Sequence, residues 1–199
     1  MSPVSPESIQ LCGGALCLDF VNTVDYDARD RPLPAHEAQG APIDRARWAR
    51  RQGVSRGRGL LAAGHEDLAA ALDLRERLYA VFAAIARGER PPAAALAHVM
   101  GVYAEAVAHA RLAPSDGERP AWDLQWPARD PGRVRFAVAA DAVALLGDPE
   151  RLARVHRCPG RDCGWLFLDT SGRRRWCSMG ACGSREKMRR MYERRRTAV

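Results

Sequence analysis

The sequence lacks the motifs that mark the common catalytic sites. Its 199 residues contain no HExxH pair, no nucleophile elbow and no phosphate-binding glycine loop. The histidines are isolated from one another along the chain: His36, His65, His98, His109 and His156. We therefore expect a protein that is not an enzyme. An N-terminal enzyme of unknown type is an alternative that has only unassigned polar residues in its favour.

The chain also lacks a long apolar run. No segment approaches the length of a membrane span, and Met1 to Gln10 has neither the basic start nor the apolar stretch of a signal peptide. Six cysteines are few for a secreted disulfide scaffold of this length, and four of them have the spacing of a metal site. We expect a cytoplasmic protein with reduced thiols and no membrane partner.

Acidic side chains are scarce near the C-terminus. Residues 151–199 carry 14 Lys and Arg against 4 Asp and Glu, which gives a net charge of +10. The first 150 residues carry 17 basic and 20 acidic side chains, which gives a net charge of −3. The tail alone is therefore suited to binding a polyanion.

Four cysteines of this tail, Cys158, Cys163, Cys177 and Cys182, form two Cys-x4-Cys pairs separated by thirteen residues. Zinc(II) takes four soft ligands in a tetrahedron, and two tight cysteine pairs supply all of them. Four protein thiolates leave no open position for water or substrate, so the predicted cofactor is one structural Zn²⁺ ion. His156 is a weaker candidate ligand, because the four thiols are better spaced. The negative charge of such a centre gives nearby arginines a local partner.

Hydrophobic spacing predicts three helices in the first 150 residues. The apolar positions of residues 67–87, 91–112 and 134–146 recur at helical steps. Gly88 and Gly147 follow the first and the third of these segments and are typical of helix ends. Because the first two segments are joined by a short connection, we expect them to pair as antiparallel helices.

Shorter elements complete the sequence-based picture. Asp148, followed by a proline, indicates the start of a short helix that runs into the first cysteine. Residues 11–24 predict a strand or turn that leads into a buried helix, and residues 44–53 predict a short helix. Residues 26–39 are polar and proline-rich, which is typical of a surface loop. Alternation over residues 122–126 indicates a small β hairpin.

These elements predict an α+β protein in two parts. Residues 1–150 would form a mainly helical domain with a small β hairpin. Residues 151–199 would form a tetracysteine module, treble-clef-like or zinc-ribbon-like, that ends in a basic helix. A segment of this length buries too little surface to fold dependably alone, so we expect zinc to hold it together.

Within the tail, two short β-prone segments, residues 165–168 and 174–176, flank a loop and predict a hairpin. Ser184 is expected to N-cap a helix that continues to Arg196. The apolar side chains of this helix share one face, which we expect to dock on the zinc core. They are Met188, Met191 and Tyr192.

The other faces of that helix are basic. A helix has the width of the DNA major groove, and arginine makes bidentate contacts with phosphate and guanine. We therefore expect DNA as the partner, and a homodimer that reads a palindromic site is left open. The alternatives are an RNA-binding or protein-interaction adaptor that uses the same tail, and a solvated basic face. The candidate DNA-binding residues are Arg173, Arg174, Arg175, Ser184, Arg185, Lys187, Arg189, Arg190 and Arg194.

Polar residues inside the apolar segment near the N-terminus are candidates for binding a small-molecule effector. Asp19, Asn22 and Thr23 lie among apolar neighbours and need partners, and Trp48 is a further candidate. The alternative is that the three polar residues cap a helix or hold a neighbouring turn. Trp122 and Trp126 would line a pocket or seal the core.

The two remaining cysteines, Cys12 and Cys17, are expected to be small buried apolar thiols, with a redox switch as the alternative. No further unpaired cysteine and no obvious histidine partner lies near them in the sequence.

Two stretches carry a resemblance to known families. Residues 163–169 (CGWLFLD), 176–179 (WCSM) and 182–183 (CG) are similar to the CGNR zinc finger, and residues 16–24 (LCLDFVNTV) resemble the start of the ABATE domain that accompanies it. The resemblance implies a stress-induced bacterial transcription regulator with a zinc-dependent DNA-binding module. Ser184 replaces the signature asparagine of the finger, and the loop between Ser171 and Arg175 is shorter than in the family. Serine caps helices as well as asparagine does, so the fold should be kept while the contacts with bases change.

Overall fold

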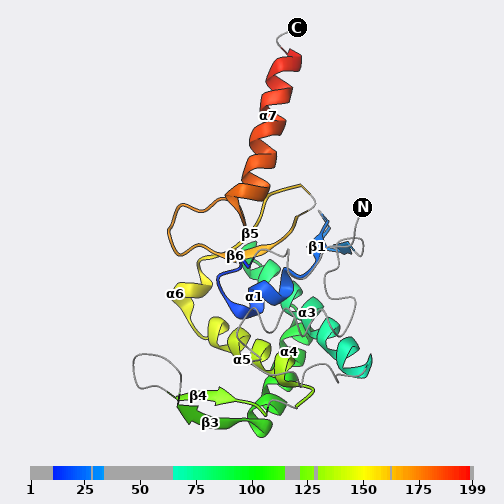
Figure 1. Ribbon diagram of the computed structural model, residues 1–199, viewed down its shortest axis with the longest axis vertical. Helices are drawn as coiled ribbons and strands as arrows, with labels where there is room; N and C mark the ends of the chain where they lie inside the picture. Colours follow the sequence, from blue (N-terminus) through cyan, green and yellow to red (C-terminus); the bar gives the residue numbers. More distant parts are fainter. Residues whose placement is uncertain are drawn as a thin grey trace.

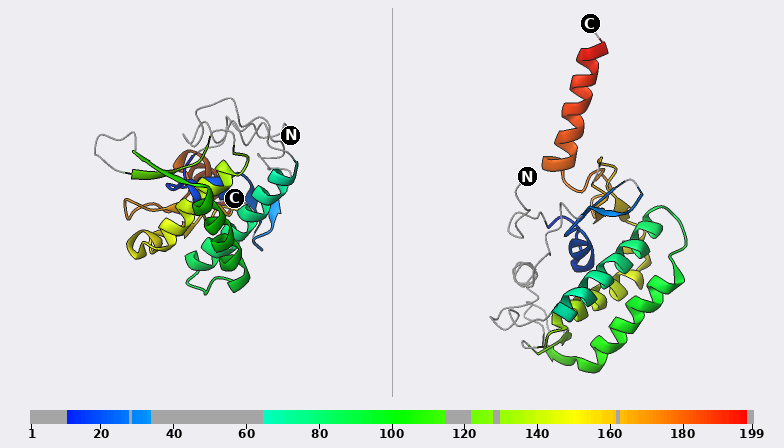
Figure 2. Two further views of the ribbon diagram at one scale, coloured as in Figure 1. Left: turned by 90° about the horizontal axis from the view of Figure 1, so that it is seen from below. Right: turned by 90° about the vertical axis from the view of Figure 1, so that its right-hand side faces the viewer.

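The computed structural model describes residues 11–27, 29–33, 65–114, 122–127, 130–161 and 163–197. Three helices form its body: α3 (His65–Ala86), α4 (Ala93–His109) and α5 (Arg133–Leu146). Helix α4 packs against both α3 and α5, and the short helix α1 (Leu16–Val21) packs against α3 and α5 (Figures 1 and 2). The structure confirms the predicted fold class, which is mostly helical with small β hairpins and a C-terminal helix.

Each of the three sheets among the described residues is an antiparallel pair of short strands. β1 (Asp25–Tyr26) pairs with β2 (Pro32–Leu33), and β3 (Arg111–Pro114) pairs with β4 (Trp122–Gln125). The strand predicted from Trp122 is confirmed. The segment that pairs with this strand was predicted to be helical as far as Leu112. That prediction was wrong, because α4 ends at His109 and Leu112 pairs with Leu124.

The third hairpin differs from the predicted one. β5 (Val155–Arg157) pairs with β6 (Leu166–Leu168), whereas residues 174–176 were expected to be the partner of that strand. The Arg174 backbone N–H donates to Asp169 Oδ2 over 3.0 Å, so it is not available to a ladder. The predicted start of the helix before β5 is confirmed, since Asp148 accepts the Arg151 N–H at 3.0 Å and caps α6 (Pro149–Leu152). This helix ends before β5 and does not reach Cys158.

The C-terminal helix does not begin as predicted. A π-helical turn, η3 (Met179–Gly183), runs directly into α7 (Ser184–Thr197). Ser184 is therefore not the N-cap: it has helical dihedral angles, and its hydroxyl donates back to the Met179 carbonyl over 2.9 Å. A helix that continues an earlier turn needs no cap at that position, because the preceding carbonyls already accept its first N–H groups.

Helix α7 projects away from the rest of the molecule (Figures 1 and 2). Its apolar face was expected to dock on the zinc core, and this prediction is wrong: Met188 is 46% exposed, Met191 38% and Tyr192 58%. Helix α7 points away from the zinc-binding region, so only its first residues lie against η3. The apolar stripe is consequently open to solvent.

The main core lies between α1, α3, α4 and α5 and also receives side chains from the C-terminal region. Leu166 and Leu168 of β6 belong to the same buried cluster as Leu18 of α1 and Leu78 of α3. Tyr26 was assigned to a surface loop, but it is fully buried, and its ring stacks on Tyr79 with centroids 3.5 Å apart. The predicted division at residue 150 stays a prediction, and the two regions share one core.

Candidate metal centre and basic groove

The four cysteines of the two pairs converge. Their sulfur atoms all lie within 4.8 Å of one another, and all four residues are buried. The Cys163 and Cys177 sulfurs are 3.6 Å apart, as are those of Cys177 and Cys182. In a tetrahedron with Zn–S bonds of about 2.3 Å, neighbouring sulfurs are about 3.8 Å apart. The cluster therefore suits a zinc ion held by four thiolates, with no position left for substrate.

The elements around the cluster fix the positions of three of its thiols. Cys158 follows β5, and its backbone N–H donates to the Trp165 carbonyl over 2.7 Å. Cys163 precedes β6, and Cys182 belongs to the turn η3. Gly160 lies so close that a Cβ atom there would be 2.9 Å from the Cys182 sulfur. Only a glycine fits at this position without displacing a metal ligand.

The thiols disturb each other's protonation because they are crowded together. Hydrogen bonds from neighbouring thiols lower the pKa of Cys158. The largest effect comes from Cys163, followed by Cys177 and Cys182. Its hydrogen bond to Cys158 in turn raises the pKa of Cys163. Four thiolates in one buried site repel one another unless a cation lies between them. This is the electrostatic requirement that a divalent metal ion meets.

Two arginines that were candidates for DNA contacts lie against this cluster. Arg185 donates to the Cys182 sulfur over 3.1 Å, and this hydrogen bond raises the pKa of the arginine. Arg174 donates to the carbonyl oxygens of Cys12 and Cys177, and its guanidinium lies 4.6 Å from the centroid of the Phe167 ring. Both side chains thus act as local partners of the metal centre, as groups around metal ligands commonly do.

The two N-terminal cysteines have different environments. Cys17 is fully buried, as expected, and burial raises the pKa of its thiol well above the ordinary value. Cys12 is only half-buried and packs against the four-cysteine cluster. The expectation of a buried thiol without a partner is therefore wrong for Cys12. A hydrogen bond with the Cys177 thiol is the main cause that lowers the pKa of Cys12.

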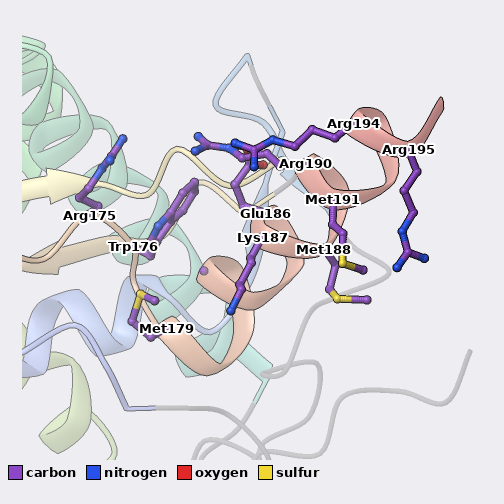
Figure 3. A pocket seen from close by; sticks show the side chains of 11 residues that line it. Arg175, Trp176, Met179, Glu186, Lys187, Met188, Arg190, Met191, Arg194 and Arg195 are labelled. Carbon is purple, nitrogen blue, oxygen red and sulfur yellow. The ribbon is translucent and has the colours of Figure 1, made fainter. Parts of the chain in front are cut away.

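A groove of about 620 Å³ runs along α7 beside the metal centre (Figure 3). Trp176 and Met179 come from the chain before α7 and form one end of it, while Met188 and Met191 lie further along the helix. The charged side chains that line it are Arg175, Glu186, Lys187, Arg190, Arg194 and Arg195. The groove therefore combines an apolar floor with a strongly cationic edge.

The groove depends on a close approach at Gly183. A Cβ atom there would be 2.8 Å from the Met179 sulfur and 3.3 Å from Cδ1 of Trp176. Glycine thus lets these two side chains lie against the start of α7. The sequence did not identify Trp176 or Met179 as site residues, because nothing in their local pattern indicates that the chain before α7 folds back beside it.

Only some of the candidate DNA-binding residues line the groove. Arg175, Lys187, Arg190 and Arg194 line the groove. Arg189 forms ion pairs with Glu186 and Glu193 at 2.7 Å and 2.6 Å, and Arg190 shares Glu186 at 2.9 Å. The remaining candidates do not line the groove. Arg173 is in the exposed loop before Cys177. Arg174, Ser184 and Arg185 make the contacts described above.

The candidate effector-binding residues make hydrogen bonds within the chain. Asp19 Oδ1 accepts the Gly13 N–H at 2.7 Å, and the Thr23 hydroxyl donates to the Phe20 carbonyl over 2.8 Å. These are contacts of the kind expected under the structural alternative. Trp48 lies outside the described residues, so its role stays a prediction.

The two other tryptophans weighed as pocket residues do not form one site. Trp126 is buried, and its indole N–H donates to the Ala106 carbonyl over 2.7 Å. Trp122 is 67% exposed on β4.

Asn22 joins the N-terminal helix to the metal-binding region. Its side-chain amide donates to the Leu166 carbonyl over 2.8 Å and accepts the Leu166 N–H at 2.9 Å. Trp165 adds a bond from its indole N–H to the Val24 carbonyl over 3.1 Å, and the Leu168 N–H donates to the Gly13 carbonyl over 2.8 Å. The segment that contains β6, between Cys163 and Cys177, is therefore anchored to residues near the N-terminus.

Comparison with known families gives two adjoining matches. Residues 14–149 match the ABATE family, described as "Putative stress-induced transcription regulator". Residues 154–195 match the CGNR zinc finger. No curated protein matches the sequence at a significant level. Neither description is that of an enzyme, and within the part of the chain that the structure describes, no helix combines the length and apolarity needed to span a membrane.

Proposed function

This chain belongs to the ABATE family and carries a CGNR zinc finger, and from that premise we propose that it is a zinc-dependent transcription regulator that binds DNA along α7. The observation that carries the proposal is the cationic groove beside the tetracysteine cluster. Helix α7 has seven basic and two acidic residues, so its surface favours a polyanion.

The metal would have a structural role. Cys158, Cys163, Cys177 and Cys182 would hold the ion, and the last of them belongs to the turn that continues into α7. Fixing that turn fixes the direction in which α7 leaves the module. The ion would supply no catalytic chemistry, because its four positions are filled by protein ligands.

The size of the electrostatic contribution can be estimated from the groove. Each phosphate that a basic residue neutralises contributes about −0.9 to the slope of log affinity against log salt concentration. Arg175, Lys187, Arg190, Arg194 and Arg195 line the groove, and five such contacts would give a slope of about −4.5. Neutralising three of them should bring the slope to about −1.8.

The test uses a triple variant, Lys187→Gln, Arg190→Gln and Arg194→Gln, and a duplex labelled for fluorescence anisotropy. We expect affinity to fall at least about tenfold at 0.1 M salt, with the smaller slope given above. Arg77→Gln is the matched control, because Arg77 is an exposed arginine of α3 paired with Asp73. Equal affinity of the triple variant and the control, with zinc content unchanged, would contradict the proposal.

The apolar floor of the groove favours a second candidate function, the binding of single-stranded RNA. Trp176 is partly exposed and Met179 is 70% exposed. Unpaired bases stack on aromatic side chains, at a gain of about 1–3 kcal/mol per base. Competition between duplex DNA and single-stranded RNA of the same length separates the two. Preference for RNA, lost in a Trp176→Ala variant, would support the second candidate.

Effector sensing and dimer formation are the remaining parts of the proposal. The shared core and the Asn22 contacts with Leu166 support the idea that a change in the N-terminal region would reach the zinc module. A thermal-shift screen of small metabolites tests for an effector. The charge of α7 disfavours pairing of two such helices, so a dimer would use another face. Native mass spectrometry measures the oligomeric state.

A further inference from the structure

A fifth thiol lies against the four-cysteine cluster. Cys12 packs on the cluster and is half-buried, and its carbonyl oxygen accepts a hydrogen bond from the same Arg174 nitrogen as that of Cys177. The four proposed zinc ligands already complete a tetrahedron, so Cys12 has no place among them. Its position beside one ligand is therefore unexplained by metal binding alone.

Backbone contacts hold Cys12 in this position. One terminal nitrogen of the Arg174 guanidinium donates to the carbonyl oxygens of both Cys12 and Cys177. The next residue, Gly13, is fixed as well, because its N–H donates to Asp19 and its carbonyl accepts the Leu168 N–H. Two cysteines that are 165 positions apart in the sequence are thus kept together by a single guanidinium.

We propose that Cys12 is an oxidation site at which a hydroperoxide joins Cys12 to Cys177 and thereby removes a ligand from the zinc ion. A partly exposed thiol can be reached by a small peroxide, whereas the second N-terminal cysteine, Cys17, is fully buried. The inference concerns the zinc site and does not depend on DNA binding.

The reaction has two steps. The Cys12 sulfur attacks one oxygen of hydrogen peroxide, the O–O bond breaks, and the thiol proton leaves with the second oxygen as water, which gives a sulfenic acid on Cys12. The Cys177 thiolate then attacks the Cys12 sulfur, a disulfide forms, and the S–O bond breaks. The departing hydroxide takes a proton from solvent and leaves as a second water. Peroxide is reduced by two electrons, and the two sulfur atoms are oxidised by two.

The consequence is loss of metal. With Cys177 held in a disulfide, Cys158, Cys163 and Cys182 would bind a zinc ion less tightly than the four thiolates together. Because Cys182 belongs to the turn that continues into α7, release of the ion loosens the base of that helix. Reduction of the disulfide by a dithiol would restore the original site.

The experiment treats the zinc-loaded chain with a few equivalents of hydrogen peroxide and follows zinc release with a chromogenic chelator. A peptide map by mass spectrometry identifies the disulfide. We expect release of one zinc per chain together with a Cys12–Cys177 linked peptide, and at least tenfold slower release in Cys12→Ser. Cys17→Ser is the matched control and should release zinc at the rate of the unmodified chain.

Two results would overturn the proposal: release at the same rate in Cys12→Ser, or a map of the unmodified chain in which only the four clustered cysteines are linked to one another. The peptide map uses the unmodified chain, so it tests for the Cys12–Cys177 disulfide even if a substitution impairs folding. A chain that binds no DNA would still give the predicted map, which separates this proposal from the proposed function.

Discussion

Replacing Asn22 by alanine should weaken the whole fold, because this side chain satisfies both backbone groups of Leu166. Asn22 is 1% exposed and Leu166 is fully buried, so water has no access to the groups left behind. An unsatisfied buried N–H or C=O costs about 1–3 kcal/mol. The loss of both bonds, at 2.8 Å and 2.9 Å, should lower the free energy of unfolding by about 3 kcal/mol or more, a large part of a typical stability of about 5–15 kcal/mol.

Urea denaturation at saturating zinc measures this difference, and Gln125→Ala is the control. Gln125 has the same amide group, but its hydrogen bond to Pro114 is exposed and 3.5 Å long, so the expected loss is below about 0.5 kcal/mol. A loss for Asn22→Ala no larger than that of the control would refute the reasoning.

The variant Asn22→Asp adds a pH test. It keeps an acceptor for the Leu166 N–H but sets a buried carboxylate against the Leu166 carbonyl. Burial should raise the folded-state pKa of the new Asp side chain above its unfolded value. The variant should therefore be most stable, relative to the unmodified chain, at a pH below the unfolded pKa, and should lose that stability as the pH rises through the folded pKa.

Three further predictions concern the metal centre and its support. Gly160→Ala should weaken zinc binding at least tenfold in a chelator competition, because the added Cβ would lie 2.9 Å from the Cys182 sulfur; Gly180→Ala, where the nearest atom is 3.9 Å away, should not. Gly164→Ala should destabilise the fold far more than Gly172→Ala in denaturant titrations. Both glycines have positive φ, but only the first Cβ would meet a buried tyrosine, at 2.6 Å. Lowering the pH from 7 to 5 should release zinc, measured as bound metal after gel filtration, because thiolate ligands must be deprotonated.

Features with a local cause could be predicted from the sequence. The four cysteines were identified by spacing, since a tight turn brings each pair together wherever the rest of the chain lies. The helices now seen as α3 and α5 follow from apolar periodicity over segments long enough to define a face. The sequence also indicated that Asn22 needs a partner, because it lies among apolar residues.

Features that depend on residues far apart in the sequence could not be predicted in this way. The partner of Asn22 is Leu166, 144 residues away, and no local pattern specifies that pairing. The position of Cys12 beside Cys177 could not be predicted for the same reason. The apolar stripe of α7 was misplaced because periodicity shows that a face exists and not what covers it, and the turn η3 directs the helix away from the core. Arg174 was assigned to DNA from its charge, although the carbonyl oxygens that it contacts come from three separate segments.

The affinity of the zinc-loaded and the metal-free chain for one DNA duplex, at one salt concentration, tests most directly whether a tetracysteine zinc site holds α7 in place for DNA. We predict that removing the metal weakens binding at least tenfold, and that Zn²⁺ restores the affinity whereas Mg²⁺ does not. Equal affinity of the two forms would contradict the account.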